Sequence, residues 1–370
     1  MSASVSLFFR QFADRTRQSV PWENQFAGTE STACWLIGGG PSLNHMPIDE
    51  IAHTPCPRMC TNLAGSRLLR PTFWTSYDPS VRFHRSIYLD PGVMKFVHPR
   101  RAMDLVPETT FKVCDCPNLY FFERDTQRGF ADFLSMSHRA IVDWNDTFLQ
   151  AIDILFRLGF RELLLAGCEL IVRPSDDWIA RAAERNVIYR PGMLLQEFTK
   201  KCETAGLTRE ELESLGTAEQ YHFDERKTLQ AAINTDLHYF RIAQYLRLCR
   251  RSMSLAGLKL ISVTPASRLN DYFPYESVES VCRRIGKSIG EPDSEPVRGL
   301  YTGQVDRTLP DLGPMRDYRP HHWKTDAPQQ PPRDQVHPPE LIEEFAGWER
   351  RAALAEALDN PAQVELKEEQ

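Results

Sequence analysis

The sequence lacks the features that would place the protein in a membrane or on a nucleic acid. Residues 1–12 have no apolar core long enough for a signal peptide, and no window approaches a membrane span. The formal net charge is −6, and no cluster of Lys and Arg forms an electrostatic footprint. We therefore expect a cytoplasmic protein without a membrane span, and the charge does not indicate a nucleic-acid partner.

The cysteine spacing also lacks the pattern of a zinc module. The chain has nine cysteines, an odd number for a disulfide framework. Cys56/Cys60 and Cys114/Cys116 match no common zinc spacing, and no histidine stands at partner spacing. We expect reduced, buried thiols and no metal ligands among the site residues.

A glycine-rich segment carries the strongest functional signal. Cys34–Ile37 is an apolar run that predicts a buried strand, and three glycines follow it at 38–40. Ser42 is a suitable N-cap for a helix that continues through residues 43–51. Such a turn can bind phosphate, because glycine admits close approach of the anion and free N–H groups of the helix N-terminus point at it.

Apolar strands that alternate with helices predict the fold class. Further strands are expected at 59–64, 73–78, 95–98, 111–114, 161–166 and 258–263. Helices are expected at 145–158, 228–255 and 277–285, with Gly159 ending the first. This pattern indicates an α/β protein with a Rossmann-like, mostly parallel sheet that has helices on both faces.

The 370 residues divide into four predicted regions, in a composition (42% hydrophobic, 25% charged) typical of globular proteins. Residues 1–30 mix Phe8, Phe9 and Phe12 with charged residues, which predicts a short N-terminal amphipathic helix. Residues 31–285 are expected to form the Rossmann-like nucleotide-binding catalytic domain. Within it, the polar, helix-prone stretch 175–217 is a candidate lid over the sheet edge.

The C-terminal part changes in composition. Ten of the 26 prolines lie between Pro292 and Pro339. This density predicts a Pro-rich linker or arm over 286–338. Residues 339–370 are expected to form a C-terminal helix followed by an acidic tail.

Polar residues fall at several predicted strand ends. Ligands of open α/β sheets bind outside the carboxyl ends of the strands, where the glycine turn, Asn62, Glu169 and the loop 264–270 would lie. Asn62 could hydrogen-bond a ribose, base or phosphate, or cap a turn. Glu169 could hold a ribose hydroxyl or a metal, or be a solvated carboxylate. Ser267 and Arg268 could bind phosphate, or belong to an exposed loop.

Five short motifs, in order, resemble a known group of enzymes. They are Gly-Gly-Gly-Pro-Ser-Leu at 38–43, Cys-Thr-Asn at 60–62, Leu-Gly-Phe-Arg-Glu…Ala-Gly-Cys-Glu at 158–169, Asn-Thr-Asp at 234–236 and Thr-Pro-Ala-Ser-Arg-Leu at 264–269. Over residues 31–285 the chain is similar to the Rossmann-like group of bacterial sialyltransferases, motility accessory factor glycosyltransferases of flagellin and archaeal 6-hydroxymethylpterin diphosphokinase.

The resemblance and the strand-end argument together imply a nucleotide-binding set. It comprises Gly38, Gly39, Gly40, Ser42, Asn62, Thr147, Gly167, Glu169 and Ser267. The family's sialyltransferases have Asn where this chain has Gly39 and Asp where it has Glu169.

Two histidines are candidates for a general base. The family's catalytic histidine would fall at Ala231, and His222 and His238 flank that position. A histidine suits deprotonation of an acceptor hydroxyl near neutral pH. We prefer His222, because it precedes the Asn-Thr-Asp motif as the family's histidine does, whereas His238 falls inside a predicted helix with apolar neighbours.

The resemblance implies a glycosyltransferase that moves a sugar from a nucleotide-activated donor to a hydroxyl acceptor. One alternative is an ATP-dependent diphosphokinase of the 6-hydroxymethylpterin type, which would need Mg²⁺. Another is a non-catalytic nucleotide-binding module. The expected partners are the nucleotide-sugar co-substrate and the acceptor, and a homo-oligomer is compatible with the sequence.

Overall fold

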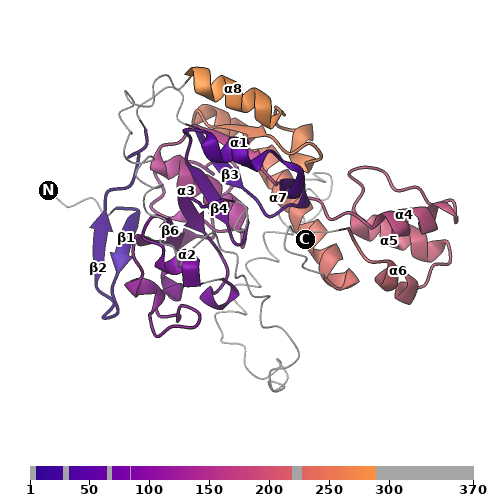
Figure 1. Ribbon diagram of the computed structural model, residues 1–370, viewed down its shortest axis with the longest axis horizontal. Coiled ribbons are helices and arrows are strands. Elements are labelled where there is room, and N and C mark those ends of the chain that lie inside the picture. Colours follow the sequence, from indigo (N-terminus) through magenta and orange to yellow (C-terminus); the bar gives the residue numbers. More distant parts are fainter. Residues whose placement is uncertain (1–5, 28–32, 65–68, 84, 219–226, 289–370) are drawn as a thin grey trace, which may run out of the picture.

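One large sheet organises the fold. A computed structural model describes residues 6–27, 33–64, 69–83, 85–218 and 227–288. Within them a nine-stranded sheet has the order β11-β10-β3-β4-β5-β6-β7-β1-β2 (Figure 1). The neighbouring strands from β11 to β7 are parallel throughout. The predicted α/β class with a mostly parallel, Rossmann-like sheet is confirmed.

The parallel strands are short and largely buried. Their bounds are β3 Ala33–Ile37, β4 Arg58–Thr61, β5 Phe73–Thr75, β6 Met94–Val97, β7 Leu119–Phe122, β10 Glu162–Ala166 and β11 Lys259–Ser262. The strand expected at 111–114 is wrong, because Val113–Asp115 forms the 3-10 helix η4. The next strand is β7 instead, where four successive buried residues fit between two neighbouring strands.

The N-terminal segment is a hairpin and not the expected helix. β1 (Phe8–Gln11) and β2 (Arg17–Val20) pair antiparallel, and β1 also pairs antiparallel with β7. Phe8 packs into the core on one face of the sheet and Phe9 into the core on the other. A strand puts consecutive side chains on opposite faces, so two adjacent aromatic residues are both buried there.

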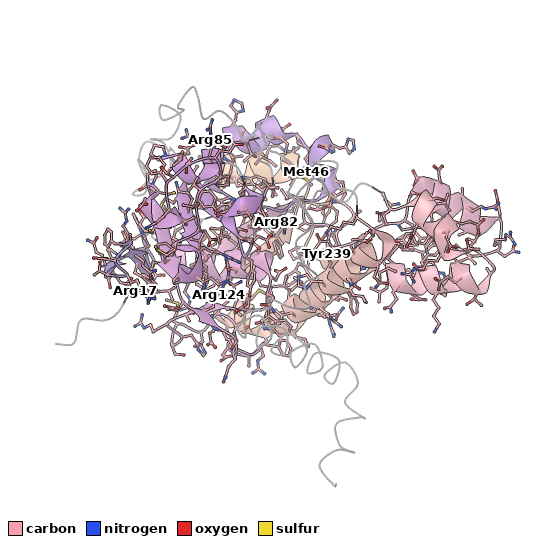
Figure 2. The ribbon with its side chains drawn as sticks, turned by 90° about the horizontal axis from the view of Figure 1, so that it is seen from below. Arg17, Met46, Arg82, Arg85, Arg124 and Tyr239 are labelled. Carbon is pink, nitrogen blue, oxygen red and sulfur yellow. The ribbon has the colours of Figure 1, made fainter. Side chains whose placement is uncertain are left out.

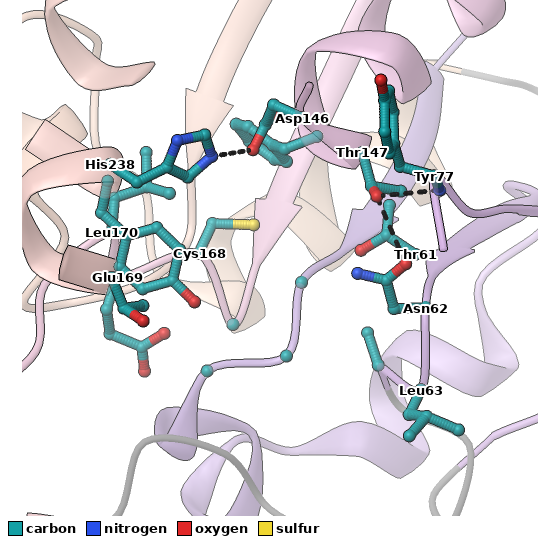
Figure 3. Close-up of a pocket in the computed structure, with 18 of the residues that line it drawn as sticks. Thr61, Asn62, Leu63, Tyr77, Asp146, Thr147, Cys168, Glu169, Leu170 and His238 are labelled. Atoms are coloured by element: carbon teal, nitrogen blue, oxygen red, sulfur yellow. Dashed lines mark hydrogen bonds and ion pairs between the residues drawn. The ribbon is translucent and has the colours of Figure 1, made fainter. Parts of the chain in front are cut away.

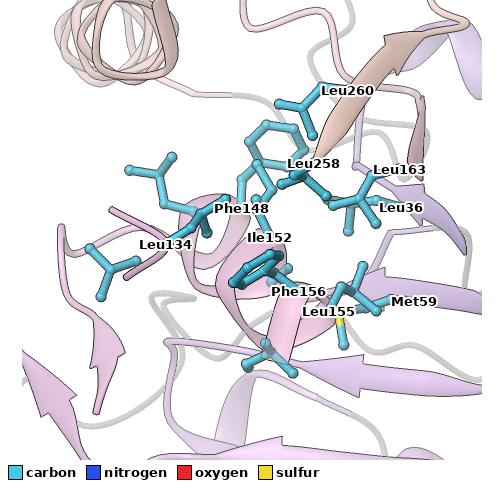
Figure 4. Packing of buried hydrophobic residues seen from close by; sticks show 14 of the residues in the cluster. Leu36, Met59, Leu134, Phe148, Ile152, Leu155, Phe156, Leu163, Leu258 and Leu260 are labelled. Carbon is cyan, nitrogen blue, oxygen red and sulfur yellow. The ribbon is translucent and has the colours of Figure 1, made fainter. Parts of the chain in front are cut away.

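Helices cover both faces of the sheet. One face carries α3 and the second half of α7, which enclose an apolar cluster with Leu36 and Leu163 (Figure 4). The other face carries α1, α2 and α8, whose apolar side chains pack with Trp35 and Ile37. The bounds are α1 Ile48–His53, α2 Arg85–Leu89, α3 Thr147–Leu158, α7 Leu229–Leu255 and α8 Val278–Ser288.

The two long helices begin and end where their caps predict. The carboxylate of Asp146 accepts a hydrogen bond from the N–H of Leu149 at the start of α3, and Gly159 ends that helix with φ of 115°. Thr228 caps α7 by accepting from the N–H of Ala231. The predictions of these two helices are confirmed.

Residues 175–217 form a helical insert. It contains α4 (Asp176–Ala183), α5 (Leu195–Thr204) and α6 (Arg209–Leu215). These helices enclose a separate apolar cluster with Trp178 and Phe198, which the first turns of α7 complete. Figure 1 shows the insert beside α7 and away from the sheet. It is helical as expected, and its role as a lid stays a prediction.

Short elements complete the described part of the chain. They are the 3-10 helices η1 Pro41–His45, η2 Ser80–Arg82, η3 Pro99–Arg101 and η5 Arg268–Asp271, and the small parallel pair β8 Arg124–Asp125 and β9 Ile141–Val142. Among the described residues, no helix combines the length and apolar character that a bilayer crossing requires. His222, the arm from residue 289 on and the predicted C-terminal helix lie outside the described residues.

The order of the strands fixes where a ligand can enter. From β3 the chain adds β4, β5, β6 and β7 on one side, and it then returns to place β10 and β11 on the other. The loops after β3 and β10 therefore leave in opposite directions. A crevice forms at such a reversal, outside the carboxyl ends of the strands.

Candidate functional site

A pocket of about 520 Å³ lies at this reversal (Figure 3). Its walls come from the turns after β3, β4, β5 and β10, the start of α3 and one face of α7. The polar residues that line it are Thr61, Asn62, Tyr77, Asp78, Arg82, Asn145, Asp146, Thr147, Glu169, Lys227, Asn234, Thr235, His238 and Tyr239. Gly38, Gly39, Gly40 and Gly167 also line it, so most of the predicted nucleotide-binding set meets in one cavity.

The glycine turn is shaped by contact with the neighbouring turn. The N–H of Gly38 donates to the carbonyl of Ala166, and the N–H of Gly40 donates to the carbonyl of Gly167, both at 2.8 Å. A Cβ at Gly38 would lie 2.5 Å from the carbonyl oxygen of Gly167. Glycine is needed here because two backbone turns touch.

A carboxylate of the protein already occupies the N-terminal end of η1. Glu169 Oε1 accepts from the N–H of Ser42 at 2.7 Å. A Cβ at Gly40 would lie 1.4 Å from Glu169 Oε2. The N–H groups of Gly38, Gly40 and Ser42 therefore all have partners within the protein, and binding of a phosphate by these residues stays a prediction. Ser42 is also not the N-cap, because η1 begins at Pro41 and follows Gly40.

Asn62 is held as a hydrogen-bond donor toward the pocket. Its backbone is left-handed, with φ of 53°, at the end of β4. Its Oδ1 accepts from Ser76 Oγ at 2.7 Å and from Thr147 Oγ1 at 3.3 Å. Because both contacts use the oxygen, the amide nitrogen is left to face the cavity (Figure 3). Thr147 is in turn fixed by the N–H of Tyr77, which donates to its hydroxyl at 3.1 Å.

His238 lines the pocket from α7 and pairs with Asp146 (Figure 3). Its Nε2 lies 3.0 Å from Asp146 Oδ2. The other oxygen of Asp146 caps α3, so one carboxylate both starts the helix and orients the imidazole. The preference for His222 as the base stays a prediction, because that residue lies outside the described ranges.

Ser267 does not line the pocket, which corrects its predicted role. It is buried, and its hydroxyl donates to the carbonyl of Cys168 at 2.6 Å while accepting from the N–H of Leu269. The neighbouring Arg268 is buried as well and pairs with Asp236. Both side chains hold the loop after β11 in place.

The pocket contains one cysteine, and it is not a nucleophile. Burial raises the pKa of the Cys168 thiol well above its ordinary value, with a smaller contribution from Glu169. The thiol therefore stays protonated near neutral pH, and only the thiolate attacks electrophiles. All nine cysteines are free thiols. In the described ranges, no three His, Cys, Asp or Glu side chains are grouped to hold a metal ion.

Sequence reasoning predicted Thr147 at the start of α3 but missed the pocket residues of the turn after β5 and Asn145 just before that helix. Tyr77 donates from its hydroxyl to Asn145, and Asp78 pairs with Arg82 at 2.7 Å. The polar end of the predicted strand 73–78 was a usable signal for Tyr77 and Asp78. The sequence contained no such signal for Arg82, because no local pattern distinguishes it from a surface arginine.

Comparisons with protein-family models, with curated proteins and with solved structures gave no match to this chain.

Proposed function

We propose that the protein is a glycosyltransferase that moves a sugar from a nucleotide-activated donor to a hydroxyl acceptor. The observation that carries this proposal is the His238–Asp146 pair, which lies in a cavity at the strand reversal of a Rossmann-like sheet. Such a cavity is where nucleotides bind in this class of fold. The resemblance of the five motifs to nucleotide-sugar enzymes points the same way.

In the proposed reaction His238 is the general base. A carboxylate can only accept a hydrogen bond, so Asp146 fixes the ring proton on Nε2 and leaves the lone pair on Nδ1. Nδ1 takes the proton of the acceptor hydroxyl as its oxygen bonds to the anomeric carbon of the sugar. The bond from that carbon to the donor phosphate oxygen breaks, and the nucleotide leaves with the electron pair.

Asn62 is the best-placed residue for holding the nucleotide. Its amide is fixed by Ser76 and Thr147, so it offers a donor without losing side-chain freedom on binding. A donor of this kind suits a base carbonyl, a ribose oxygen or a phosphate oxygen. The alternative diphosphokinase needs carboxylates that hold Mg²⁺. The three pocket carboxylates each have a partner in Arg82, His238 or the N–H of Ser42.

Two measurements test the proposal. The first is a thermal-shift panel of CMP, UDP, ADP and ATP with and without Mg²⁺, in which a pyrimidine nucleotide should raise the melting temperature without metal. Stabilisation by ATP only with Mg²⁺ would favour the diphosphokinase, and no shift with any nucleotide would contradict nucleotide binding.

The second measurement is the turnover of variants with the donor so identified. His238→Ala should lose about 100- to 10,000-fold in rate, since it removes the base, while retaining nucleotide affinity. Asp146→Asn should lower the rate less, because the imidazole remains but is no longer held in one tautomer. His45→Ala is a matched control for loss of an imidazole, since His45 does not line the pocket. Full activity of His238→Ala would contradict the assigned base.

A further inference from the structure

The glycine-turn side of the pocket carries a carboxylate. On the glycine-turn side, the N–H groups of Gly38, Gly40 and Ser42 have partners within the protein, and the carboxylate of Glu169 lies against the turn. A phosphate placed there would have to displace a carboxylate or lie beside it, where like charges repel. Glu169 therefore makes the glycine-turn side of the pocket less favourable for a phosphate than a side that carries positive charge.

Three arginines follow the neighbouring strands β5, β6 and β7, and one of them, Arg82, lines the pocket. Arg82 follows β5 in η2, Arg100 follows β6 in η3 and Arg124 follows β7 in β8. Because β5, β6 and β7 are parallel neighbours, their carboxyl ends bring these side chains to one edge of the sheet. We call this set the arginine rim; Figure 2 labels two of its members, Arg82 and Arg124.

Tyr77 connects the rim to the pocket. Tyr77 lines the cavity, the guanidinium of Arg124 lies 3.8 Å from the centroid of its ring, and that of Arg100 lies 5.5 Å from it. Arg82 lines the cavity itself and pairs with Asp78, the residue after Tyr77. The cationic groups are thus arranged around one side chain of the pocket wall.

The rim is held in a defined geometry. Arg124 donates to Gln150 Oε1 at 2.8 Å, and Gln150 is itself fixed because its amide donates to Thr75 Oγ1 at 2.6 Å. The hydroxyl of Tyr77 is anchored on Asn145 at the start of α3. Guanidinium groups that are oriented in advance match the geometry of phosphate oxygens and lose little freedom on binding.

We propose that the arginine rim, and not the glycine turn, binds a phosphate group of the ligand. The chemistry is that of a mono- or diphosphate, which either the nucleotide donor or a phosphorylated acceptor can supply. The inference rests on the proposed function only for the kind of molecule that carries the phosphate.

Inorganic pyrophosphate is the probe for a test by isothermal titration of the full chain. Arg82→Gln and Arg124→Gln should each weaken binding about tenfold or more, because each removes a charge-assisted hydrogen bond. Arg100→Gln should weaken it less, and because Arg100 is exposed this variant should keep its fold. Arg181→Gln, an exposed arginine of α4 paired with Glu184, is the matched control and should bind as the parent does.

A second set of variants addresses the glycine turn. Gly39→Val should weaken pyrophosphate binding less than Arg124→Gln does, and Glu169→Gln should not weaken it, since that variant removes a negative charge from the pocket. The proposal is overturned if the parent binds no pyrophosphate, if Arg100→Gln and Arg124→Gln bind as the parent does, or if Gly39→Val alone abolishes binding.

A competition experiment identifies the source of the phosphate. Displacement of pyrophosphate by a nucleotide assigns the rim to the donor, and simultaneous binding of both assigns it to a phosphorylated acceptor. Either result supports the rim. If pyrophosphate binds at the rim but no nucleotide stabilises the protein, the proposed function is contradicted and phosphate binding by the arginine rim is supported. If a nucleotide binds and the rim variants bind pyrophosphate normally, the rim fails and the proposed function stands.

Discussion

The sheet body and the helical insert are held together in different ways. The body packs apolar side chains on both faces of its sheet, in two large clusters. The insert has one small cluster of its own and shares only α7 with the body at length. A second attachment is polar and centres on one buried residue, Asp236 of α7. The difference indicates that burial of apolar surface stabilises the body. The insert is instead attached to the body by one shared helix and a few hydrogen bonds.

Asp236 joins three separate segments. Its carboxylate accepts from the N–H of Val172 and the N–H of Leu195, both at 2.9 Å, and from Arg268 at 3.2 Å. These partners lie before the insert, at the start of α5 and in the loop after β11. Asp236 therefore connects the insert to the loops that follow β10 and β11. Half a helical turn later, His238 lines the pocket.

The largest expected effect on stability comes from removing this attachment. Asp236→Ala leaves two buried N–H groups without an acceptor and the buried Arg268 without its carboxylate, so the free energy of unfolding should fall by about 3–5 kcal/mol. Denaturant unfolding measures the loss, and limited proteolysis should show cleavage within residues 173–217 first. Asp271→Ala removes an exposed carboxylate of η5 and should change little. Equal loss in both variants would contradict the role of Asp236.

A matched pair of leucines sharpens the comparison. Leu164 of β10 and Leu212 of α6 are both fully buried, one in the body and one in the insert. Each change to Ala should lower stability by about 3 kcal/mol, because it leaves a cavity. Hydrogen exchange should differ: Leu164→Ala accelerates exchange across the sheet, whereas Leu212→Ala accelerates it in α4, α5 and α6. Identical exchange profiles would show that the two regions unfold as one unit.

A buried lysine in the sheet body should make the stability of the protein depend on pH. Burial lowers the pKa of Lys95 in β6 from 10.5 to about 7, and its ammonium nitrogen donates to the carbonyl of Asp90 at 2.7 Å. The unfolded chain then binds more protons between these two values, so stability from this group rises with pH there by up to about 1.4 kcal/mol per unit. Below pH 7 the full penalty for burying the charge is present.

Lys95→Met tests the predicted rise of stability with pH. The variant should be more stable than the parent at pH 6, and the gain should shrink as the pH approaches 10.5. Thermal melts of both proteins across this range provide the measurement. A gain that does not vary with pH would show that Lys95 keeps its ordinary pKa in the folded protein.

Much of the fold could be predicted from local sequence. The apolar run that became β3, the capped helix α3 and the long helix α7 each carry their signal within a few neighbouring residues. The hairpin at the N-terminus could not be predicted in this way. Its residues fit an amphipathic helix as well as a strand, and pairing of β1 with β7 decided between them.

The candidate site also has a part that the sequence predicts and a part that it does not. The sequence by itself determined that glycines 38–40, Asn62 and Glu169 would meet, because strand ends of a parallel sheet share one edge, and the family resemblance added Thr147. Only the tertiary structure decided what they do there. Ser42 and Glu169 are 127 positions apart, and His238 and Asp146 are 92 apart. No local pattern carries such pairings, because they depend on which turns and helices the sheet places side by side.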